Sequence, residues 1–155
     1  MKDDAVNLAI AVISFTMFGA AEELAAHPFG IGFPFLMMAA VYFADRRTAL
    51  HAILFAVAAG AAEDALSGLA PLTSATFFAI AAAFVRSSRR YFPSAHFAAV
   101  AAYPVYQIWL WMWYPAIGGG VFMRIFAAFA LSLPAYVAVT LALRALERKG
   151  AVDEP

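Results

Sequence analysis

The apolar positions of this chain form six continuous segments rather than an alternating pattern. They cover residues 5–26, 33–44, 48–66, 71–85, 94–114 and 121–146, and a short polar tail follows over residues 147–155. Alanine is abundant within the segments, and polar or helix-breaking residues separate them. The strands of a membrane barrel would alternate polar and apolar residues, so the pattern predicts an all-α protein.

The length and composition of the segments indicate a membrane protein. The chain has 155 residues, of which 65% are hydrophobic and 13% are charged. A soluble domain is typically about 45–50% apolar and about 25% charged. A membrane-spanning helix needs about 20 apolar residues, or fewer where protein surrounds it. We therefore expect residues 1–155 to form a single transmembrane domain, an integral membrane bundle of six transmembrane helices.

Two of these segments need an interpretation of their own. The second segment is short for a span, so it is either tilted, extended at its ends or partly re-entrant. The first segment carries Glu22 and Glu23 and lacks a clean small-residue cleavage site, so we interpret it as a retained helix rather than a signal peptide.

Basic residues predict the orientation of the bundle. All of them except Arg124 lie before the first segment, in the second and fourth connections, or at the end of the sixth segment. A six-helix zigzag places these positions on one side, which the positive-inside rule assigns to the cytoplasm. Both termini are then cytoplasmic. Ten basic residues balance ten acidic ones, so there is no basic footprint and we expect no nucleic-acid partner.

Acidic residues gather on the opposite side of the predicted bundle, near the ends of the first and third segments. They are Glu22, Glu23, Glu63 and Asp64. An unpaired carboxylate at mid-span costs about 2.5–3.5 kcal/mol, so such groups usually face the bundle or water. Glu63 and Asp64 form either a polar partner contact or a solvated helix end. Arg124 is the cation predicted on this side, and we expect it to pair with one of these carboxylates.

Two further patterns bear on packing and on the membrane interface. Ala52, Ala56 and Gly60 recur at four-residue spacing, which lets neighbouring helices approach closely in lipid. The second half of the fifth segment carries tryptophans and tyrosines, including Trp109 and Tyr114. We interpret these aromatics as an interfacial belt, with a stacking surface for a ligand or partner as the alternative.

No motif predicts a catalytic residue, a metal site or a cofactor. Glu23 and His27 are one helical turn apart, which would place them on one face, but no third ligand is evident. Residues 118–120 are three glycines without the Lys-Ser/Thr of a phosphate-binding loop. The chain contains no cysteine, which excludes disulfides and thiolate chemistry.

One stretch carries a recognisable motif. Residues 33–38 read Phe-Pro-Phe-Leu-Met-Met, and Asp-Arg-Arg follows at 45–47. A Gly-x-x-x-Asp-x-x-Ser-Gly turn then leads into Pro-Leu, and its members are Gly60, Asp64, Ser67, Gly68, Pro71 and Leu72. The sequence resembles the MreD family of bacterial rod shape-determining proteins. The motif resemblance covers about residues 33–80, and the resemblance in size and helix layout covers most of the chain.

The resemblance implies a non-enzymatic component of the rod-shape and cell-wall elongation complex, which maintains cell shape and guides peptidoglycan synthesis. It implies a multi-pass location in the bacterial inner membrane and an MreC-type rod-shape protein as partner. Gly60, Asp64, Ser67, Gly68 and Pro71 would form a tight polar turn at the outer face that a partner could read.

A different class of protein shares this layout. The substrate-binding component of an energy-coupling-factor vitamin transporter also has six helices, cytoplasmic termini and small-residue faces. Such a binder needs a pocket of aromatic and polar groups, which the aromatics of the fifth segment with Arg124 and Glu22 could supply. A membrane enzyme such as an intramembrane protease ranks last, because the carboxylates lie at helix ends.

Overall fold

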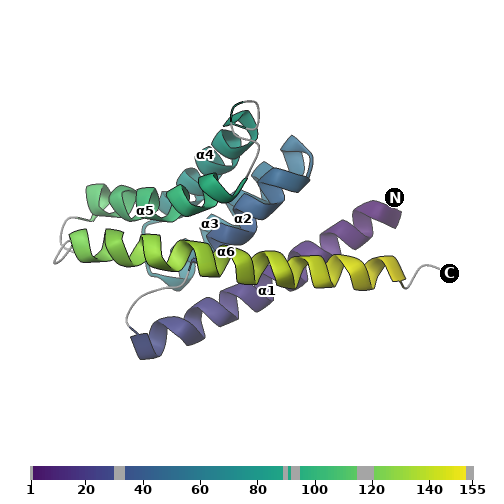
Figure 1. Ribbon diagram of the computed structural model, residues 1–155, viewed down its shortest axis with the longest axis horizontal. Coiled ribbons are helices and arrows are strands. Elements are labelled where there is room, and N and C mark those ends of the chain that lie inside the picture. Colours follow the sequence, from purple (N-terminus) through teal and green to yellow (C-terminus); the bar gives the residue numbers. More distant parts are fainter. Residues whose placement is uncertain (1, 30–33, 89–90, 92–94, 115–120, 153–155) are drawn as a thin grey trace.

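The computed structural model describes residues 2–29, 34–88, 91, 95–114 and 121–152. These residues form α1 (Lys2–Phe29), α2 (Phe35–Arg46), α3 (Ala49–Leu66), α4 (Thr73–Ser88), α5 (Ala95–Trp113) and α6 (Val121–Val152). No strand occurs among them, which confirms the all-α prediction and its six helices. Figure 1 shows long α6 across the middle of the view, with α1 below it and α4 above it.

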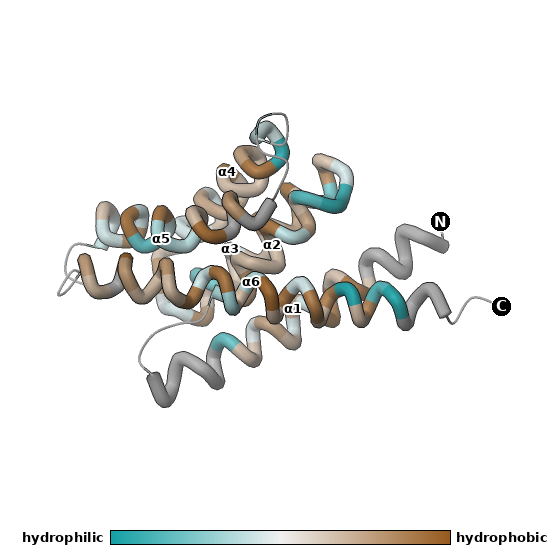
Figure 2. Tube along the Cα trace, viewed as in Figure 1, coloured by the Kyte–Doolittle hydropathy of each residue, from teal (hydrophilic) through white to brown (hydrophobic). Residues whose placement is uncertain are grey.

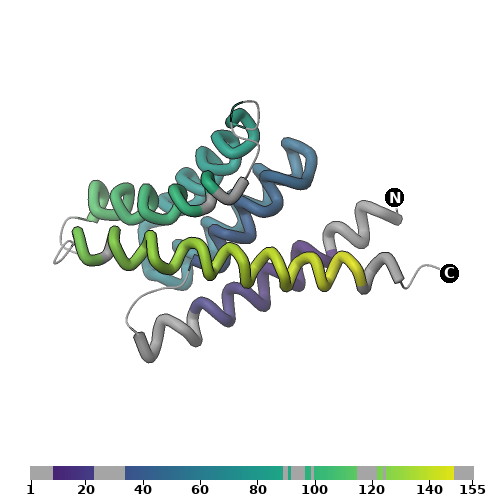
Figure 3. The backbone as a smooth tube through the Cα atoms, in the orientation of Figure 1, coloured from purple at the N-terminus to yellow at the C-terminus, as the bar shows by residue number. Residues whose placement is uncertain are grey.

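The ends of the helices alternate between two ends of the molecule. The N-terminal end of α1 and the C-terminal end of α6 lie together at the right of Figure 1. Following the chain in Figure 3, the connection between α2 and α3 and the C-terminal end of α4 lie toward that same end. The turn between α3 and α4, the end of α5 and the start of α6 lie toward the other end. The arrangement is the one expected for a zigzag of six helices.

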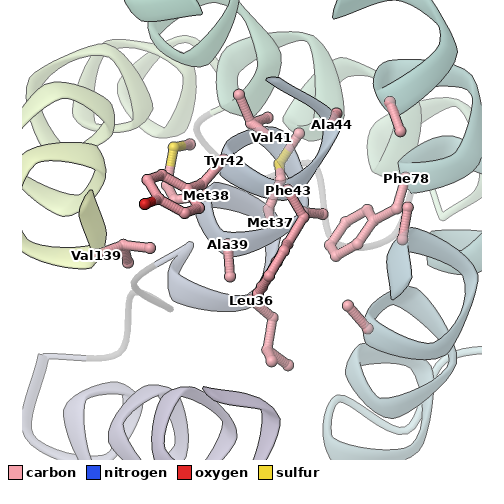
Figure 4. Packing of buried hydrophobic residues seen from close by; sticks show 14 of the residues in the cluster. Leu36, Met37, Met38, Ala39, Val41, Tyr42, Phe43, Ala44, Phe78 and Val139 are labelled. Atoms are coloured by element: carbon pink, nitrogen blue, oxygen red, sulfur yellow. The ribbon is translucent and has the colours of Figure 1, made fainter. Parts of the chain in front are cut away.

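Helix α2 occupies the centre of the bundle. It packs against each of the other five helices, and every side chain from Leu36 to Ala44 is buried. A helix that is apolar all round is typically one that protein surrounds on every side. Figure 4 shows Phe78 of α4 and Val139 of α6 reaching α2 from opposite sides. With 12 residues, α2 is about 18 Å long, which is shorter than the hydrocarbon core of a bilayer, about 30 Å thick.

Small residues allow the close packing around α2. Ala52, Ala56 and Gly60, the four-residue stripe of α3, are all buried, as is Ala59 beside them. An added Cβ at Gly60 would lie 2.4 Å from the Cα of Ala75, so the backbones of α3 and α4 touch there. The stripe therefore serves packing inside the bundle.

Several helix boundaries differ from the predicted ones. Helix α6 continues to Val152, through residues expected to form a polar tail. The continuation is stabilised at Glu147, which bonds to two residues of the α2 region, and no proline interrupts residues 147–152. Helix α4 begins at Thr73 rather than at Pro71. Leu72 has a φ of +70°, a left-handed conformation that cannot belong to the helix.

Two of the described helices are long and apolar enough to cross a membrane, namely the segments Ala49–Leu66 and Ile125–Arg148. In each of them 33% of the apolar window is buried inside the molecule. The core helix of a soluble protein would be mostly buried. The remaining faces of α3 and α6 are thus apolar and exposed, with Leu54, Phe126 and Leu141 among their exposed side chains.

Candidate functional site

The connection between α3 and α4 contains most of the residues predicted as functional. Ser67 is the C-cap of α3, and Gly68 follows with a φ of +64°. The N–H of Leu69 donates to the carbonyl of Asp64 at 2.9 Å. This is the six-to-one bond of a Schellman turn, in which glycine takes the left-handed position at no steric cost. The predicted tight turn is therefore present, and Gly68 has the role that its position in the motif suggests.

Asp64 binds the start of the next helix. Its side chain is 3% exposed, and its Oδ1 accepts the N–H of Ser74 at 2.7 Å. Ser74 lies in the first turn of α4, where backbone N–H groups have no partner within the helix. Leu72, which precedes the helix, has no side-chain acceptor. The carboxylate of Asp64 therefore caps α4 from the preceding helix, where the helix dipole also favours a negative charge.

Three aromatic side chains of the α5 region hold the same turn. The hydroxyl of Tyr106 lies 2.5 Å from the Oγ of Ser74, and Nε1 of Trp109 donates to the carbonyl of Thr73 at 3.1 Å. The hydroxyl of Tyr114 accepts the N–H of Ala70 at 2.7 Å. The polar groups of these aromatics, predicted as a belt or a stacking surface, are thus engaged in positioning the start of α4.

Other aromatics from the same stretch do face outward. Trp111 and Trp113 are exposed, and their place in an interfacial belt stays a prediction. Trp109 packs against both Phe77 and Trp113, with ring centroids 5.9 Å and 5.8 Å apart. The end of α5 therefore presents one aromatic face to the turn and another to the surroundings.

Glu22 repeats the capping arrangement at the start of α2. Its Oε2 accepts the N–H of Leu36 at 3.1 Å, and Leu36 lies in the first turn of that helix. Pro34, which precedes α2, makes no capping bond with a side chain. An acidic residue near the end of α1 thus caps α2, as an acidic residue near the end of α3 caps α4. The side chains of Glu22 and Glu63 also interact with each other, so both capped ends lie close together.

The surface of the α3–α4 turn is exposed although its interior is bonded. Ser67, Gly68 and Pro71 are exposed, and the Oγ of Ser67 donates to Oε1 of Glu63 at 3.0 Å. Leu72 is 65% exposed in spite of its apolar side chain. A left-handed conformation costs about 1–2 kcal/mol in a residue that has a Cβ. Hydrogen bonds to Ala70 and Thr73 on both sides hold Leu72 in that conformation.

Some predicted interactions lie outside the described side chains. The side chains of Glu23, His27 and Arg124 lie outside the described part of the chain. The ion pair expected between Arg124 and an acidic residue therefore stays a prediction. The same holds for the glycines at 118–120. Within the described part of the chain, no three histidine, aspartate or glutamate side chains are placed to hold a metal ion.

A second polar cluster lies at the opposite end of the bundle and was missed by sequence reasoning. Oε1 of Glu147 accepts a bond from the guanidinium of Arg47 at 3.0 Å, and its Oε2 accepts the hydroxyl of Tyr42 at 2.9 Å. The guanidinium of Arg86 donates to the backbone carbonyls of Ala44 and Arg47. These contacts tie α6 and α4 to the end of α2. Their sequence separations, up to 105 residues, give no local pattern that could reveal them.

The bonding of Ser74 is not that of an activated serine nucleophile. Asp64 binds the backbone N–H of Ser74, whereas the Ser74 hydroxyl meets Tyr106. Activation of a serine nucleophile needs a base bonded to its hydroxyl and access for a substrate. Ser74 has no exposed surface, so its observed role is to pack and bond at the start of α4.

The chain was compared with protein-family models, with curated proteins and with solved structures, and none of them matches it.

Proposed function

We propose that the chain is a multi-pass helical protein of a bacterial inner membrane, with both termini in the cytoplasm. The exposed apolar surface of α3 and α6 supports this location. Soluble monomers rarely expose large apolar patches. The hydrophilic stretches in Figure 2 lie toward the ends of the helices, among them the α2–α3 connection and the last described turns of α6. Such a distribution suits a bundle whose middle faces lipid.

Within that membrane, we propose a non-enzymatic role in the rod-shape and cell-wall elongation complex, beside an MreC-type partner. The resemblance of residues 60–72 to the MreD motif suggests this role. The observation that carries it is the exposed, strained turn around Leu72. Strained backbone that its surroundings hold in place is concentrated at binding and switch regions. A partner that reads this turn would meet Ser67, Gly68 and Pro71, while Gly60 and Asp64 build the support beneath.

The vitamin-transporter reading needs a pocket beside the α5 aromatics. The polar groups of Tyr106, Trp109 and Tyr114 are instead bonded to the α3–α4 turn. Glu22 is likewise engaged, with the N–H of Leu36. This use of the side chains favours the scaffold role over the binding role.

A pull-down of the tagged full chain from native membranes in mild detergent, analysed by mass spectrometry, tests the role. We expect rod-shape proteins and cell-wall synthases to be recovered. The variant Ser67→Lys should reduce their recovery, because it places a long charged side chain on the exposed turn. Ser87→Lys is the matched control, since Ser87 is also an exposed serine but lies at the other end of α4.

Two results would overturn the proposed role. Recovery of a coupling membrane subunit with paired ATPases would instead support the transporter component. Equal recovery of rod-shape partners by the Ser67→Lys and Ser87→Lys variants would show that they do not read the turn.

A further inference from the structure

A groove of about 580 Å³ lies on the surface between α1, the end of α2 and the first half of α3. Binding sites for small molecules usually enclose about 300–1,000 Å³. Its position is distinct from the α3–α4 turn, and none of the residues of that turn lines it.

The walls of the groove are almost entirely apolar. The groove contains an aromatic cluster of Phe15, Phe43 and Phe55. The ring centroid of Phe55 lies 4.3 Å from that of Phe43 and 6.4 Å from that of Phe15. Val12 of α1 and Leu54 of α3 line the groove and are each 57% exposed, so the groove opens to the surroundings of the bundle. In a membrane these surroundings are acyl chains.

One end of the groove is polar and basic. Arg47 and His51 line it there, and the guanidinium of Arg47 lies 5.8 Å from the ring centroid of Phe43. The helix α3 carries the lining from His51 to Ala58, a distance of about 10 Å along its axis. The groove therefore joins an apolar slot, running along the helix, to a basic end.

The charge around this end is positive in spite of two nearby carboxylates. Glu147 partly neutralises the charge of Arg47 through an ion pair at 3.0 Å, and Asp45 lies in the last turn of α2. Among the described residues, more basic than acidic ones lie at the end of α2, the end of α4 and the late turns of α6: Arg46, Arg47, Arg86, Arg144 and Arg148. An anionic headgroup at the mouth of the groove would thus meet a favourable field.

We propose that this groove binds one anionic phospholipid of the cytoplasmic leaflet, with an acyl chain against the phenylalanines and the phosphate beside Arg47 and His51. The site rests on the proposed membrane location but not on the role in cell-wall elongation. Two features select the occupant. The apolar slot opens toward lipid along α1 and α3, and its basic end lies at the end of the bundle that the positive-inside rule places at the cytoplasmic headgroups.

The first test measures retention of lipid by native mass spectrometry. The purified full chain is loaded in detergent with palmitoyl-oleoyl phosphatidylglycerol or with the phosphatidylcholine that has the same chains. We expect saturable retention of one phosphatidylglycerol molecule and weaker retention of phosphatidylcholine. Ala58→Trp should abolish the retention, because the indole would fill the slot. Ala83→Trp, a change at an exposed alanine of α4 outside the groove, should leave it unchanged.

The second test separates headgroup recognition from the fit of the acyl chain. Arg47→Gln should weaken phosphatidylglycerol binding about fivefold, as expected for removal of one basic residue near an anionic headgroup. It should leave phosphatidylcholine binding unchanged. Arg46→Gln is the matched control, because it removes one charge from the same end of the bundle at an exposed residue that does not line the groove. It should weaken phosphatidylglycerol binding less than Arg47→Gln does.

Three results would overturn the site. They are equal retention of the two lipids by the unchanged protein, retention that never saturates, and unaltered retention in the Ala58→Trp variant. Loss of rod-shape partners in the Ala58→Trp pull-down, without any preference between lipids, would assign the groove to a protein partner instead. The two lipid-binding assays contain no elongation protein. A negative result in them is therefore distinguishable from failure of the proposed role in cell-wall elongation. Extraction of the chain from membranes by alkaline carbonate would contradict the membrane location itself.

Discussion

At the scale of single residues, the main feature is that carboxylates cap helices to which they do not belong. Glu22 of α1 accepts from the first turn of α2, and Asp64 of α3 accepts from the first turn of α4. Neither Pro34 nor Leu72, which precede these helices, can supply a side-chain acceptor. In an apolar bundle, unpaired N–H groups at the start of a helix are destabilising. A carboxylate from the preceding helix that accepts such a group therefore stabilises the fold.

Replacing Asp64 by alanine should therefore destabilise the protein. It removes the acceptor for the buried N–H of Ser74, and the expected loss is about 1–3 kcal/mol of the free energy of unfolding. Asp64→Asn keeps an acceptor oxygen and should lose less. Thermal unfolding in detergent, followed by tryptophan fluorescence, measures both. Glu63→Gln is the control, and a loss as large as that of Asp64→Ala would contradict the capping role.

Gly60 should be intolerant of any side chain. A Cβ there would lie 2.4–2.6 Å from backbone atoms of Ser74 and Ala75, which cannot move without separating α3 from α4. Overpacking of this kind typically costs about 1–3 kcal/mol, so Gly60→Ala should lower the melting temperature. In Gly19→Ala the nearest atom is a side-chain carbon of Leu66 at 3.8 Å, an ordinary contact. Equal melting temperatures of the two variants would refute the close approach.

The residue-scale features that the sequence reveals are those with a local pattern. Asp64 lies just before the turn and Gly68 lies within it, at the spacing of the motif. A tight polar connection could therefore be predicted there. The partners of that turn could not be predicted. Ser74 and Tyr106 are 32 residues apart, and apolar helices of similar composition give no signal for which of them meet. The sequence likewise could not show that Trp109 and Tyr114 bond to this turn. Aromatic residues are found both at membrane interfaces and in contacts inside a bundle.

At the scale of helices, the short α2 organises the others. The other five helices surround this 12-residue helix, so it does not need the length of a membrane-spanning helix. The end of α2 is fastened to α6 through Tyr42, Arg47 and Glu147. The sequence predicted the position of this segment but left its tilt and its surroundings open. These depend on contacts with α5 and α6, far along the chain.

Glu147→Ala should loosen the attachment of α6 to α2. It removes the acceptor of the Tyr42 hydroxyl and the ion-pair partner of Arg47, two side chains that are partly or fully buried. Hydrogen bonds to charged groups contribute about 1.5–3 kcal/mol, so a clear fall in the melting temperature is expected. Arg148→Ala, at the next and exposed position, is the control. A similar fall in both variants would show that the end of α6 contributes through helicity alone.

At the scale of the whole molecule, the two ends of the bundle differ in charge and in bonding. One end gathers Arg46, Arg47 and Arg86 at the ends of α2 and α4, and the start of α1 and the end of α6 lie toward it (Figure 1). The other end carries the acid-capped helix starts and the exposed turn at Leu72. Two helices with largely exposed apolar faces run between these ends. The proposed orientation across a membrane requires a division of this kind.

The orientation can be measured directly because the chain contains no cysteine, so any introduced cysteine is unique. The variants Ser67→Cys and Ser87→Cys place exposed thiols at opposite ends of α4. Spheroplasts that express the full chain are treated with a membrane-impermeant maleimide before or after permeabilisation. We expect Ser67→Cys to react in intact spheroplasts and Ser87→Cys to react only after permeabilisation. Reaction of both cysteines from the same side would contradict the membrane-spanning bundle on which this account depends.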